Sequence, residues 1–405
     1  VLMDARGSVL AAQAVSGGTL VEIPDLEPYS VVALREGAGA RPATPGAPTA
    51  TQAGGAIVLE NALLRVEISA SGDITRIYDK KVGREVLPPE AQANALLAFE
   101  DRPMNYDAWD IDIFYEDRME KLEGVEGVTI SEQGPLRASV EITRRYRRSR
   151  IRQTISLTRD SRRIDFDTWI DWREQHTLLK AAFPVNVLSP TATFDVQWGN
   201  VERPTHRNTS WEWARFETCA HKWADLSEGD YGVALLNDCK YGYDVRDNVL
   251  RLSLLKSATS PDPNADQGEQ MMVYSLLPHP GNWREGVVPA AYDLNNPLLL
   301  RRVRGGTSTA EMAGSLVSVS APNVIVETVK RAEDGNGLIV RLYENQRQRG
   351  SVTLTAGFAL AAAYHCNLLE ADERALEIEG NQVTIEITPY QIVTLRLVSV
   401  EMRKP

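Results

Sequence analysis

The segment Asn105–Asp112 carries the side chains of this sequence that are best suited to contact a sugar. Asp107 and Asp110 flank Trp109; carboxylates accept hydrogen bonds from hydroxyl groups, and an indole face packs on the C–H face of a sugar ring. On a strand, Asp107 and Trp109 would share one face and Asp110 would take the other. We therefore predict Asp107 and Trp109 as the substrate-side pair, with Asp110 in support. The alternative is an acidic loop around a buried tryptophan.

A second segment, Ser260–Gly268, combines two prolines, two aspartates, an asparagine and a glycine. Residues of these types fix turns, so the segment predicts a long, shaped loop between two strands. Loops carry binding residues more often than strands do, and Asp262 and Asp266 supply its carboxylates. The alternative is a rigid connection without a binding role.

Catalytic chemistry is harder to find in this chain. Glycoside hydrolysis needs two carboxyl groups that face each other across the scissile bond, one of them with a raised pKa. The aspartates of Asn105–Asp112 are sequence neighbours, and neighbours cannot flank a bond from opposite sides. Phosphate-binding loops and the GxSxG, HExxH and CxxC motifs are also absent from the sequence. We therefore assign no catalytic residue to this chain.

A metal site is not expected either. No histidine has another histidine two to five residues away, which is the local spacing of metal-ligand pairs. Glu217, Cys219 and His221 would share one face of a strand, but a metal site would need further ligands. A polar strand face with a small packing cysteine is the favoured interpretation. The remaining cysteines, Cys239 and Cys366, are far apart in sequence, so we predict no disulfide framework and a cytoplasmic location.

The composition limits the class of partner. The chain has 405 residues, a net charge of −11 and 43% hydrophobic residues. That hydrophobic content is enough for a sizeable core and excludes intrinsic disorder. Nucleic acids and anionic membranes attract a basic field, so the acidic balance argues against both. No apolar run reaches 18 residues, and we predict no transmembrane helix.

The sequence predicts that the elements that position these residues are β-strands. Apolar and polar residues alternate through most of the chain, as in 164–172, where Ile164, Phe166, Ile170 and Trp172 share one face. We predict an all-β, antiparallel protein. The predicted units are a small β unit over 1–36, a linker rich in Ala, Gly, Pro and Thr over 37–56, a large β-sandwich over 57–320 and a C-terminal β domain over 321–405.

Longer motifs point to a family. The region 203–248 contains Arg203–Glu212, Arg215–Glu217, Ala220–Glu228, Tyr231–Asp238 and Lys240–Asp244. Shorter segments elsewhere are Asp107–Asp110, Asp171–Glu174, Pro261–Gly268 with Pro278–His279, Arg341–Glu344, Asn367–Glu370 and Thr388–Tyr390. Together they resemble the C-terminal region of the α-mannosidases of glycoside hydrolase family 38. The resemblance is strongest to the branch with cytosolic, vacuolar and many bacterial members, and it extends over nearly the whole chain.

The resemblance implies a layout. In this family an N-terminal α/β barrel holds a zinc ion, through an early His-x-Asp and further ligands, and carries an aspartate nucleophile. A three-helix bundle follows it. Neither is expected in this chain, which would begin in the small β unit after the bundle and would be inactive alone. A large supersandwich of the galactose-mutarotase-like kind and a terminal β domain would follow.

The resemblance also implies that loops of the supersandwich close over the barrel's active site. By chain order, Asp107–Asp112 and Asp262–Gly268 would be these loops, so Asp107, Trp109, Asp110, Asp262 and Asp266 become candidate rim residues. Relatives usually carry a histidine where this chain has Gln270. If that histidine contacts substrate in relatives, the contact is altered here.

Three functions remain open. The leading one is the non-catalytic β region of a retaining, zinc-dependent α-mannosidase in glycan breakdown. Its partners would be mannose-containing oligosaccharides and the preceding barrel and bundle, and homo-oligomer formation stays open. An aldose-epimerase-like enzyme would need a general acid and base, for which His206, Glu212 and His221 are available. A carbohydrate-binding module would need an exposed aromatic platform, unless its tryptophans fill the core. The candidates for that platform are Trp198, Trp211, Trp213 and Trp223.

Overall fold

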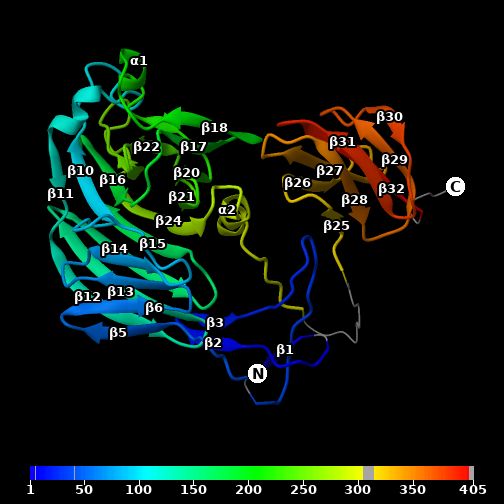
Figure 1. Ribbon diagram of the computed structural model, residues 1–405, viewed down its shortest axis with the longest axis horizontal. Coiled ribbons are helices and arrows are strands. Elements are labelled where there is room, and N and C mark those ends of the chain that lie inside the picture. Colours follow the sequence, from blue (N-terminus) through cyan, green and yellow to red (C-terminus); the bar gives the residue numbers. More distant parts are fainter. Residues whose placement is uncertain (5, 41, 304–313, 401–405) are drawn as a thin grey trace.

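The computed structural model of the protein describes residues 1–4, 6–40, 42–303 and 314–400. It is almost entirely β, as predicted, with two α-helices, α1 (Ser210–Trp213) and α2 (Val287–Asn295), and one 3-10 helix, η1 (Ile113–Asp117), in these described ranges. Figure 1 shows a large β body, a smaller β-sandwich at the C-terminal end, and short N-terminal strands that lie below both. No helix within these ranges is long and apolar enough to cross a membrane.

The large body contains three sheets in the part of the chain described, and neighbouring strands in them run antiparallel. The long sheet has the order β12 (Val125–Gln133), β13 (Arg137–Tyr146), β14 (Ser149–Thr158), β15 (Ile164–Trp172), β24 (Gly268–Pro280), β21 (Tyr231–Asn237), β20 (Trp223–Ser227), β17 (Thr191–Val196), β18 (Gly199–Pro204). The middle sheet has the order β11 (Met119–Lys121), β10 (Ala95–Glu100), β16 (Thr177–Pro184), β23 (Val249–Lys256), β22 (Gly242–Arg246), β19 (Thr218–Cys219). The short sheet has the order β5 (Thr49–Ala53), β6 (Ala56–Glu60), β7 (Leu64–Ile68), β8 (Ile74–Asp79), β9 (Arg84–Glu85).

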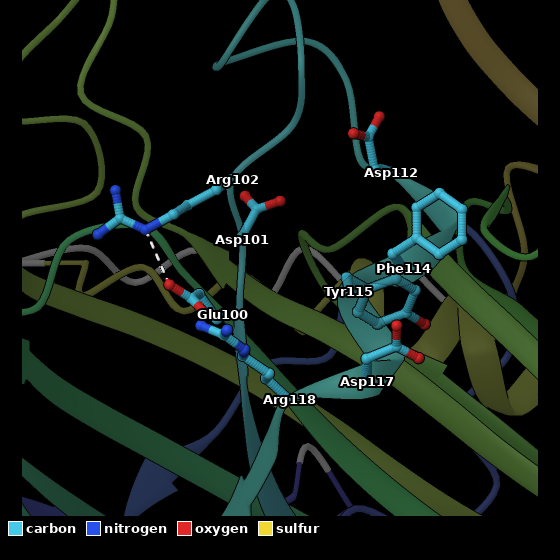
Figure 2. A pocket seen from close by; sticks show the side chains of 8 residues that line it. All are labelled: Glu100, Asp101, Arg102, Asp112, Phe114, Tyr115, Asp117 and Arg118. Carbon is cyan, nitrogen blue, oxygen red and sulfur yellow. Dashed lines mark hydrogen bonds and ion pairs between the residues drawn. The ribbon is translucent and has the colours of Figure 1, made fainter.

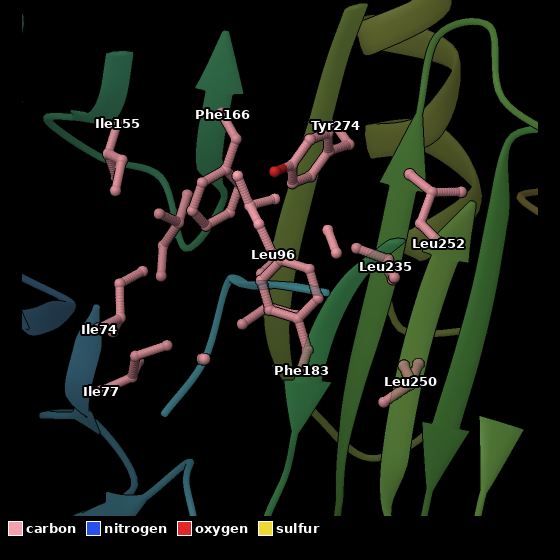
Figure 3. Packing of buried hydrophobic residues seen from close by; sticks show 14 of the residues in the cluster. Ile74, Ile77, Leu96, Ile155, Phe166, Phe183, Leu235, Leu250, Leu252 and Tyr274 are labelled. Atoms are coloured by element: carbon pink, nitrogen blue, oxygen red, sulfur yellow. The ribbon is translucent and has the colours of Figure 1, made fainter. Parts of the chain in front are cut away.

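One continuous apolar core joins these sheets. The predicted face of 164–172 is fully buried in β15, because alternate side chains of a strand point to the same side. Phe166 stacks on Tyr274 of β24 at a ring-centroid distance of 5.1 Å, and Phe183 of β16 meets Phe166 edge to face at 5.5 Å. Figure 3 shows these rings together with Ile74 and Ile77 of β8. The sandwich is therefore held by contacts among all three sheets.

Smaller units flank this body. The N-terminal strands pair as β1 (Leu2–Met3) with β4 (Arg35–Glu36) and β2 (Ala12–Val15) with β3 (Gly18–Val21). The C-terminal unit has one sheet with the order β25 (Val317–Val319), β28 (Gly350–Ala356), β31 (Gln382–Ile387). Its other sheet has the order β26 (Val324–Arg331), β27 (Leu338–Glu344), β32 (Ile392–Ser399), β29 (Leu360–Cys366), β30 (Asp372–Leu376). The two sheets enclose a separate apolar cluster that includes Val340, Leu354 and Leu395.

Two predicted boundaries need correction. The linker predicted over 37–56 is too long, because β5 pairs with β6 and buries Ala50 in the main core. The sandwich predicted to end at 320 ends earlier, because β25 pairs with β28 of the C-terminal unit. Thr49–Ala53 consists of two threonines, two alanines and a glutamine, a composition that also suits a loop, so the sequence did not reveal the strand. Residues 304–313 and 401–405, which fall within the predicted domains, lie outside the described residues.

Side-chain contacts join the large body to the C-terminal unit. Trp198 meets Tyr343 edge to face at 5.5 Å, and the hydroxyl of Tyr343 lies 3.0 Å from that of Tyr292 on α2. Asn200 donates to the carbonyl of Asn345 at 2.8 Å. The C-terminal unit therefore packs beside β18 and α2 (Figure 1) and away from β10 and α1.

Candidate functional site

The two candidate loops leave the same edge of the middle sheet. β10 and β23 both pair antiparallel with β16, so they run parallel to each other. Glu100, the last residue of β10, lies opposite Thr177, and Lys256, the last residue of β23, lies opposite Leu178. The loop after β10 contains Asp107–Asp110, and the loop after β23 contains Asp262–Asp266. The pairing register therefore brings together two segments that are about 150 residues apart in the chain.

Asp107 joins the two loops directly. Its Oδ2 accepts hydrogen bonds from the backbone N–H of Thr259 at 2.7 Å, the Thr259 hydroxyl at 3.1 Å and the backbone N–H of Ser260 at 3.1 Å. Its Oδ1 lies 3.6 Å from Nδ1 of His176. Partial burial raises the pKa of Asp107, but the Thr259 hydrogen bonds and the His176 charge outweigh it, and the net pKa is lowered. We call Asp107 with Thr259 and Ser260 the loop tether.

The first loop is a turn and not a strand. The backbone N–H groups of Trp109 and Asp110 both donate to the carbonyl of Tyr106, at 2.8 and 2.9 Å, and Tyr106 has a φ of 52°. The prediction that Asp107 and Trp109 share a face is therefore wrong, because face alternation holds only for extended backbone. Asp107 points inward to the tether, whereas Trp109 is 71% exposed and Asp110 is also exposed. The alternative of a buried tryptophan does not apply either.

The second loop is shaped by its own aspartates. Oδ1 of Asp262 accepts from the backbone N–H of Asn264 at 2.8 Å, and Oδ2 of Asp266 accepts from the backbone N–H of Lys256 at 2.8 Å. Each carboxylate thus uses one oxygen in the loop, while both residues remain exposed. Gln270 lies outside the loop, on β24 opposite Ile170 of β15.

A charged cluster beneath the first loop was missed in the sequence. Glu116 of η1 accepts from Arg207 at 2.8 Å and from Arg251 of β23 at 2.5 Å. Burial raises the pKa of Glu116, but the hydrogen bonds from both arginines outweigh it and lower the pKa to about 2. Glu116 therefore stays ionised and fixes η1 both to the middle sheet and to the chain just before α1.

Lys180 continues this cluster inside the sheet. Its side chain is fully buried, lies between the carboxylates of Glu217 and Asp244, and has Nζ 2.5 Å from Oδ2 of Asp244. Asp244 also accepts from Arg251 at 2.7 Å, which links Lys180 to Glu116. Burial lowers the pKa of Lys180, but the two carboxylates raise it by more, so the ammonium keeps its charge. We call Glu116, Arg251, Asp244, Lys180 and Glu217 the anchor network.

The anchor network holds exposed rings at one end of the molecule. Trp109 and Phe114 flank the start of η1, and Trp211 and Trp213 lie on α1, which follows Arg207. Figure 1 shows the loop before η1 and helix α1 at the same end of the large body. Of the four tryptophans predicted as a platform, only Trp211 and Trp213 are exposed. Trp198 packs on Tyr343 and Trp223 stacks on Trp283 at 5.4 Å.

The other chemical groupings do not assemble. Nδ1 of His206 lies 3.3 Å from Glu212, but Glu212 also caps α1, and His221 packs edge to face on Tyr241 at 5.4 Å. Glu217 turns toward Lys180, so Glu217, Cys219 and His221 do not converge on a common point. In the residues that the structure describes, no group of three or more His, Cys, Asp or Glu side chains could hold a metal ion.

Known proteins match this chain along most of its length. Residues 59–264 match the glycosyl hydrolases family 38 C-terminal domain, and residues 323–395 match the family 38 C-terminal beta sandwich domain. The mouse protein alpha-mannosidase 2C1 is 38% identical over 85% of this chain and 34% of its own length. The alpha-mannosidase of Saccharomyces cerevisiae is 30% identical over 84% of this chain and 35% of its own length.

A solved structure has the same fold. A family 38 glycosyl hydrolase from Enterococcus faecalis superposes with a TM-score of 0.76 at 18% identity, over 98% of this chain and 52% of that protein. The chain spans about a third of the length of the curated relatives it matches. The first of these matches contains the motifs at residues 107–110 and 203–244. The chain belongs to glycoside hydrolase family 38 and corresponds to the C-terminal β region of its α-mannosidases.

Proposed function

We propose that this chain is the non-catalytic β region of a retaining, zinc-dependent α-mannosidase, where it supports the catalytic barrel and shapes the rim of the mannose site. The observation that carries the proposal is the loop tether. Three hydrogen bonds to one oxygen of Asp107 unite two loops at one sheet edge, where Trp109 and Asp110 project into solvent. The relatives that match most of this chain are α-mannosidases by name, which supports the reaction class.

The candidate rim residues then take different roles. Trp109 offers an exposed indole face for the C–H face of a sugar ring, and the carboxylate of Asp110 accepts hydroxyl hydrogen bonds beside it. Asp262 and Asp266 can accept further hydroxyls through the oxygen that each does not use within its loop. Asp107 is a positioning residue, because its Oδ2 already serves three donors and its side chain is only 18% exposed.

The exposed rings at this end also suit a protein partner. The rings of Trp109, Phe114, Trp211 and Trp213 are all exposed, and exposed apolar surface that gathers in one region marks interaction sites. We propose that the preceding barrel and helical bundle cover part of this surface. Zinc would orient mannose hydroxyls from that barrel, because the part of this chain that the structure describes holds no group of three or more side chains that could bind the metal. Three free cysteines and the resemblance to the cytosolic branch support a cytoplasmic location.

The epimerase-like alternative has weaker support. The contact between His206 and Glu212 is the one observation in its favour. The Glu212 carboxylate accepts from the backbone N–H of Thr209 at 2.9 Å, as half of the capping box of α1. A general base held as a helix cap is poorly placed to move a proton on a substrate.

The proposal is tested by Trp109→Ala and Asp110→Asn in the full-length protein, with aryl α-mannosides as substrates. Loss of one sugar contact of this kind removes about 1.5–3 kcal/mol, so we expect kcat/KM to fall by roughly ten- to a hundredfold in each variant. Leu369→Ala, an exposed residue of the C-terminal unit, is the control and should leave kcat/KM unchanged. Wild-type kcat/KM in both loop variants would exclude the rim role.

A further inference from the structure

The segment after helix α2 joins two folded units without regular structure of its own. Helix α2 ends at Asn295, and the units on either side of the segment have separate apolar clusters. Figure 1 shows this part of the chain, in yellow, leaving α2. No hydrogen bond or ion pair joins residues 297–303 to another residue that the structure describes. The backbone can therefore be drawn out of the fold without breaking other contacts.

The side chains of this segment are unusually accessible. The four apolar side chains of Leu298–Val303 are between 67% and 86% exposed, and Arg301 and Arg302 are exposed as well. A trypsin-like protease cuts after an arginine, because an acid in its specificity pocket pairs with the guanidinium group. Exposed segments outside regular structure are the preferred places for such cuts. The segment thus combines the side chain that the protease recognises with a backbone that it can reach.

Other exposed arginines are held more firmly. Arg102 donates from Nε to Glu100 at 2.9 Å, a bond that Figure 2 shows. Arg118 lies 2.5 Å from the same carboxylate, and its backbone carbonyl accepts from the N–H of Glu100 at 3.0 Å. Exposure alone therefore does not distinguish Arg301 and Arg302. The distinction is that they have no such partner among the residues described.

The two units on either side of the segment also hold each other without it. Besides the ring and amide contacts described above, the Tyr390 hydroxyl donates to Oδ1 of Asn200 at 2.8 Å. The N-terminal part of the chain adds a second contact. The Tyr29 carbonyl accepts from the N–H of Leu316 at 3.1 Å, and the Tyr29 hydroxyl donates to the carbonyl of Val326 at 2.7 Å. A break in the connecting segment would leave all these contacts in place.

We propose that Leu298–Val303 is a proteolytic processing site, at which an arginine-specific serine protease hydrolyses the peptide bond after Arg301 or Arg302 and leaves the two pieces assembled. Water adds as the C–N bond breaks, so the arginine gains a carboxylate and the next residue gains an ammonium group. Both candidate loops lie on the larger piece, and the loop tether and the anchor network stay intact. The inference does not depend on the proposed function.

The test treats the folded 405-residue chain with a low concentration of trypsin and follows the products by intact-mass spectrometry. We expect the first cut after Arg301 or Arg302, and the two pieces should elute together from a size-exclusion column in native buffer. The double variant Arg301→Gln with Arg302→Gln should lose intact chain about tenfold more slowly or less. Most other basic residues lie in strands or hydrogen-bonded turns, which must open before they can be cut.

A matched double variant controls for exposed arginines in general. Arg102→Gln with Arg118→Gln removes two other exposed arginines and should be cut as fast as the parent chain. Equal melting temperatures of both double variants and the parent chain would show that the rates compare folded proteins. A first cut outside Leu298–Val303 would overturn the proposal, as would an unchanged rate in Arg301→Gln with Arg302→Gln. Separation of the two pieces in native buffer would overturn the claim that they stay assembled.

Discussion

The loop tether predicts a measurable local opening when Asp107 is replaced by alanine. The substitution removes the single oxygen that receives Thr259 N, Thr259 Oγ1 and Ser260 N. Hydrogen bonds to an ionised acceptor are worth about 1.5–3 kcal/mol each, but three donors on one oxygen are not additive, and solvent can replace part of the loss at a half-buried site. We expect a net loss of about 2–3 kcal/mol, or roughly 30- to 150-fold in the opening equilibrium.

Amide hydrogen exchange at Thr259 and Ser260 measures this opening directly. The two amides should exchange roughly 30- to 150-fold faster in Asp107→Ala, while the amides of β15 and the global melting temperature change little, because the loop opens locally. Asp107→Asn keeps an acceptor oxygen without the charge and should recover only part of the protection. Asp262→Ala, which removes one hydrogen bond within the same loop, is the matched control. Exchange at both amides within twofold of the parent in Asp107→Ala would refute the tether.

The tether also has a defined pH dependence. The pKa of Asp107 is lowered in the folded protein, so its ionised form is favoured by folding. The stability that it contributes is therefore fully present above the unfolded pKa of about 3.9 and is lost as the pH falls through the lower folded value. Protection of Thr259 and Ser260 should stay constant from neutral pH down to about pH 4. Protection that falls between pH 7 and 5 would contradict the assignment of this protection to the Asp107 carboxylate.

Two further predictions concern the anchor network and the missing chemistry. Lys180→Met leaves Glu217 and Asp244 buried without their shared cation, so the free energy of unfolding in urea should drop by about 3–5 kcal/mol. The triple variant Lys180→Met, Glu217→Gln and Asp244→Asn should recover much of this loss. Equal stability of Lys180→Met and the parent chain would contradict the network. The 405-residue chain alone should neither hydrolyse aryl α-mannosides nor retain stoichiometric zinc in metal analysis, and one tightly held zinc per chain or turnover above buffer would contradict the non-catalytic assignment.

Much of the fold could be predicted because strand periodicity is a local property. The apolar face of 164–172 became the buried face of β15 without exception, since alternation along one strand needs no knowledge of its neighbours. Thr49–Ala53 was assigned to the predicted linker because it has no large apolar residue and only Ala50 is buried. Whether such a segment forms a strand depends on its pairing with the adjacent β6, and the pattern of residues within the segment does not show that pairing.

The sequence predicted which residues belong to the candidate site, but it did not predict the direction of their side chains. Residue types singled out Asp107, Trp109 and Asp110, and the family resemblance placed this segment beside Asp262–Gly268. The inward turn of Asp107 depends on the left-handed backbone at Tyr106, a conformation that a tyrosine rarely adopts and its sequence does not announce. Helix η1 was missed for a similar reason, because no hydrophobic period marks so short a 3-10 helix.

Lys180 was the one available signal for the anchor network. A lysine within the otherwise apolar run Leu178–Phe183 must be paired if that strand is buried, because an isolated buried charge is too costly. Its partners Glu217 and Asp244 lie 37 and 64 residues further along, so sequence spacing could not identify them. The sequence thus indicates that Lys180 has a buried partner, but it does not identify that partner.

The direction of that network gives it a role beyond stability. A buried ion pair is often no more stabilising than apolar side chains of the same volume, so stability alone does not explain why Lys180, Asp244 and Arg251 occupy the centre of the middle sheet. Charged hydrogen bonds differ from apolar contacts in being directional. Arg251 is shared between Asp244 in the sheet and Glu116 on η1, so the angle of η1 is set by the sheet itself. Because η1 carries Phe114 and follows the tethered loop, the same bonds fix the place of Phe114 and the end of that loop. A rim that must meet a ligand or a partner domain in a defined geometry requires such directional support, which a purely apolar contact would not provide.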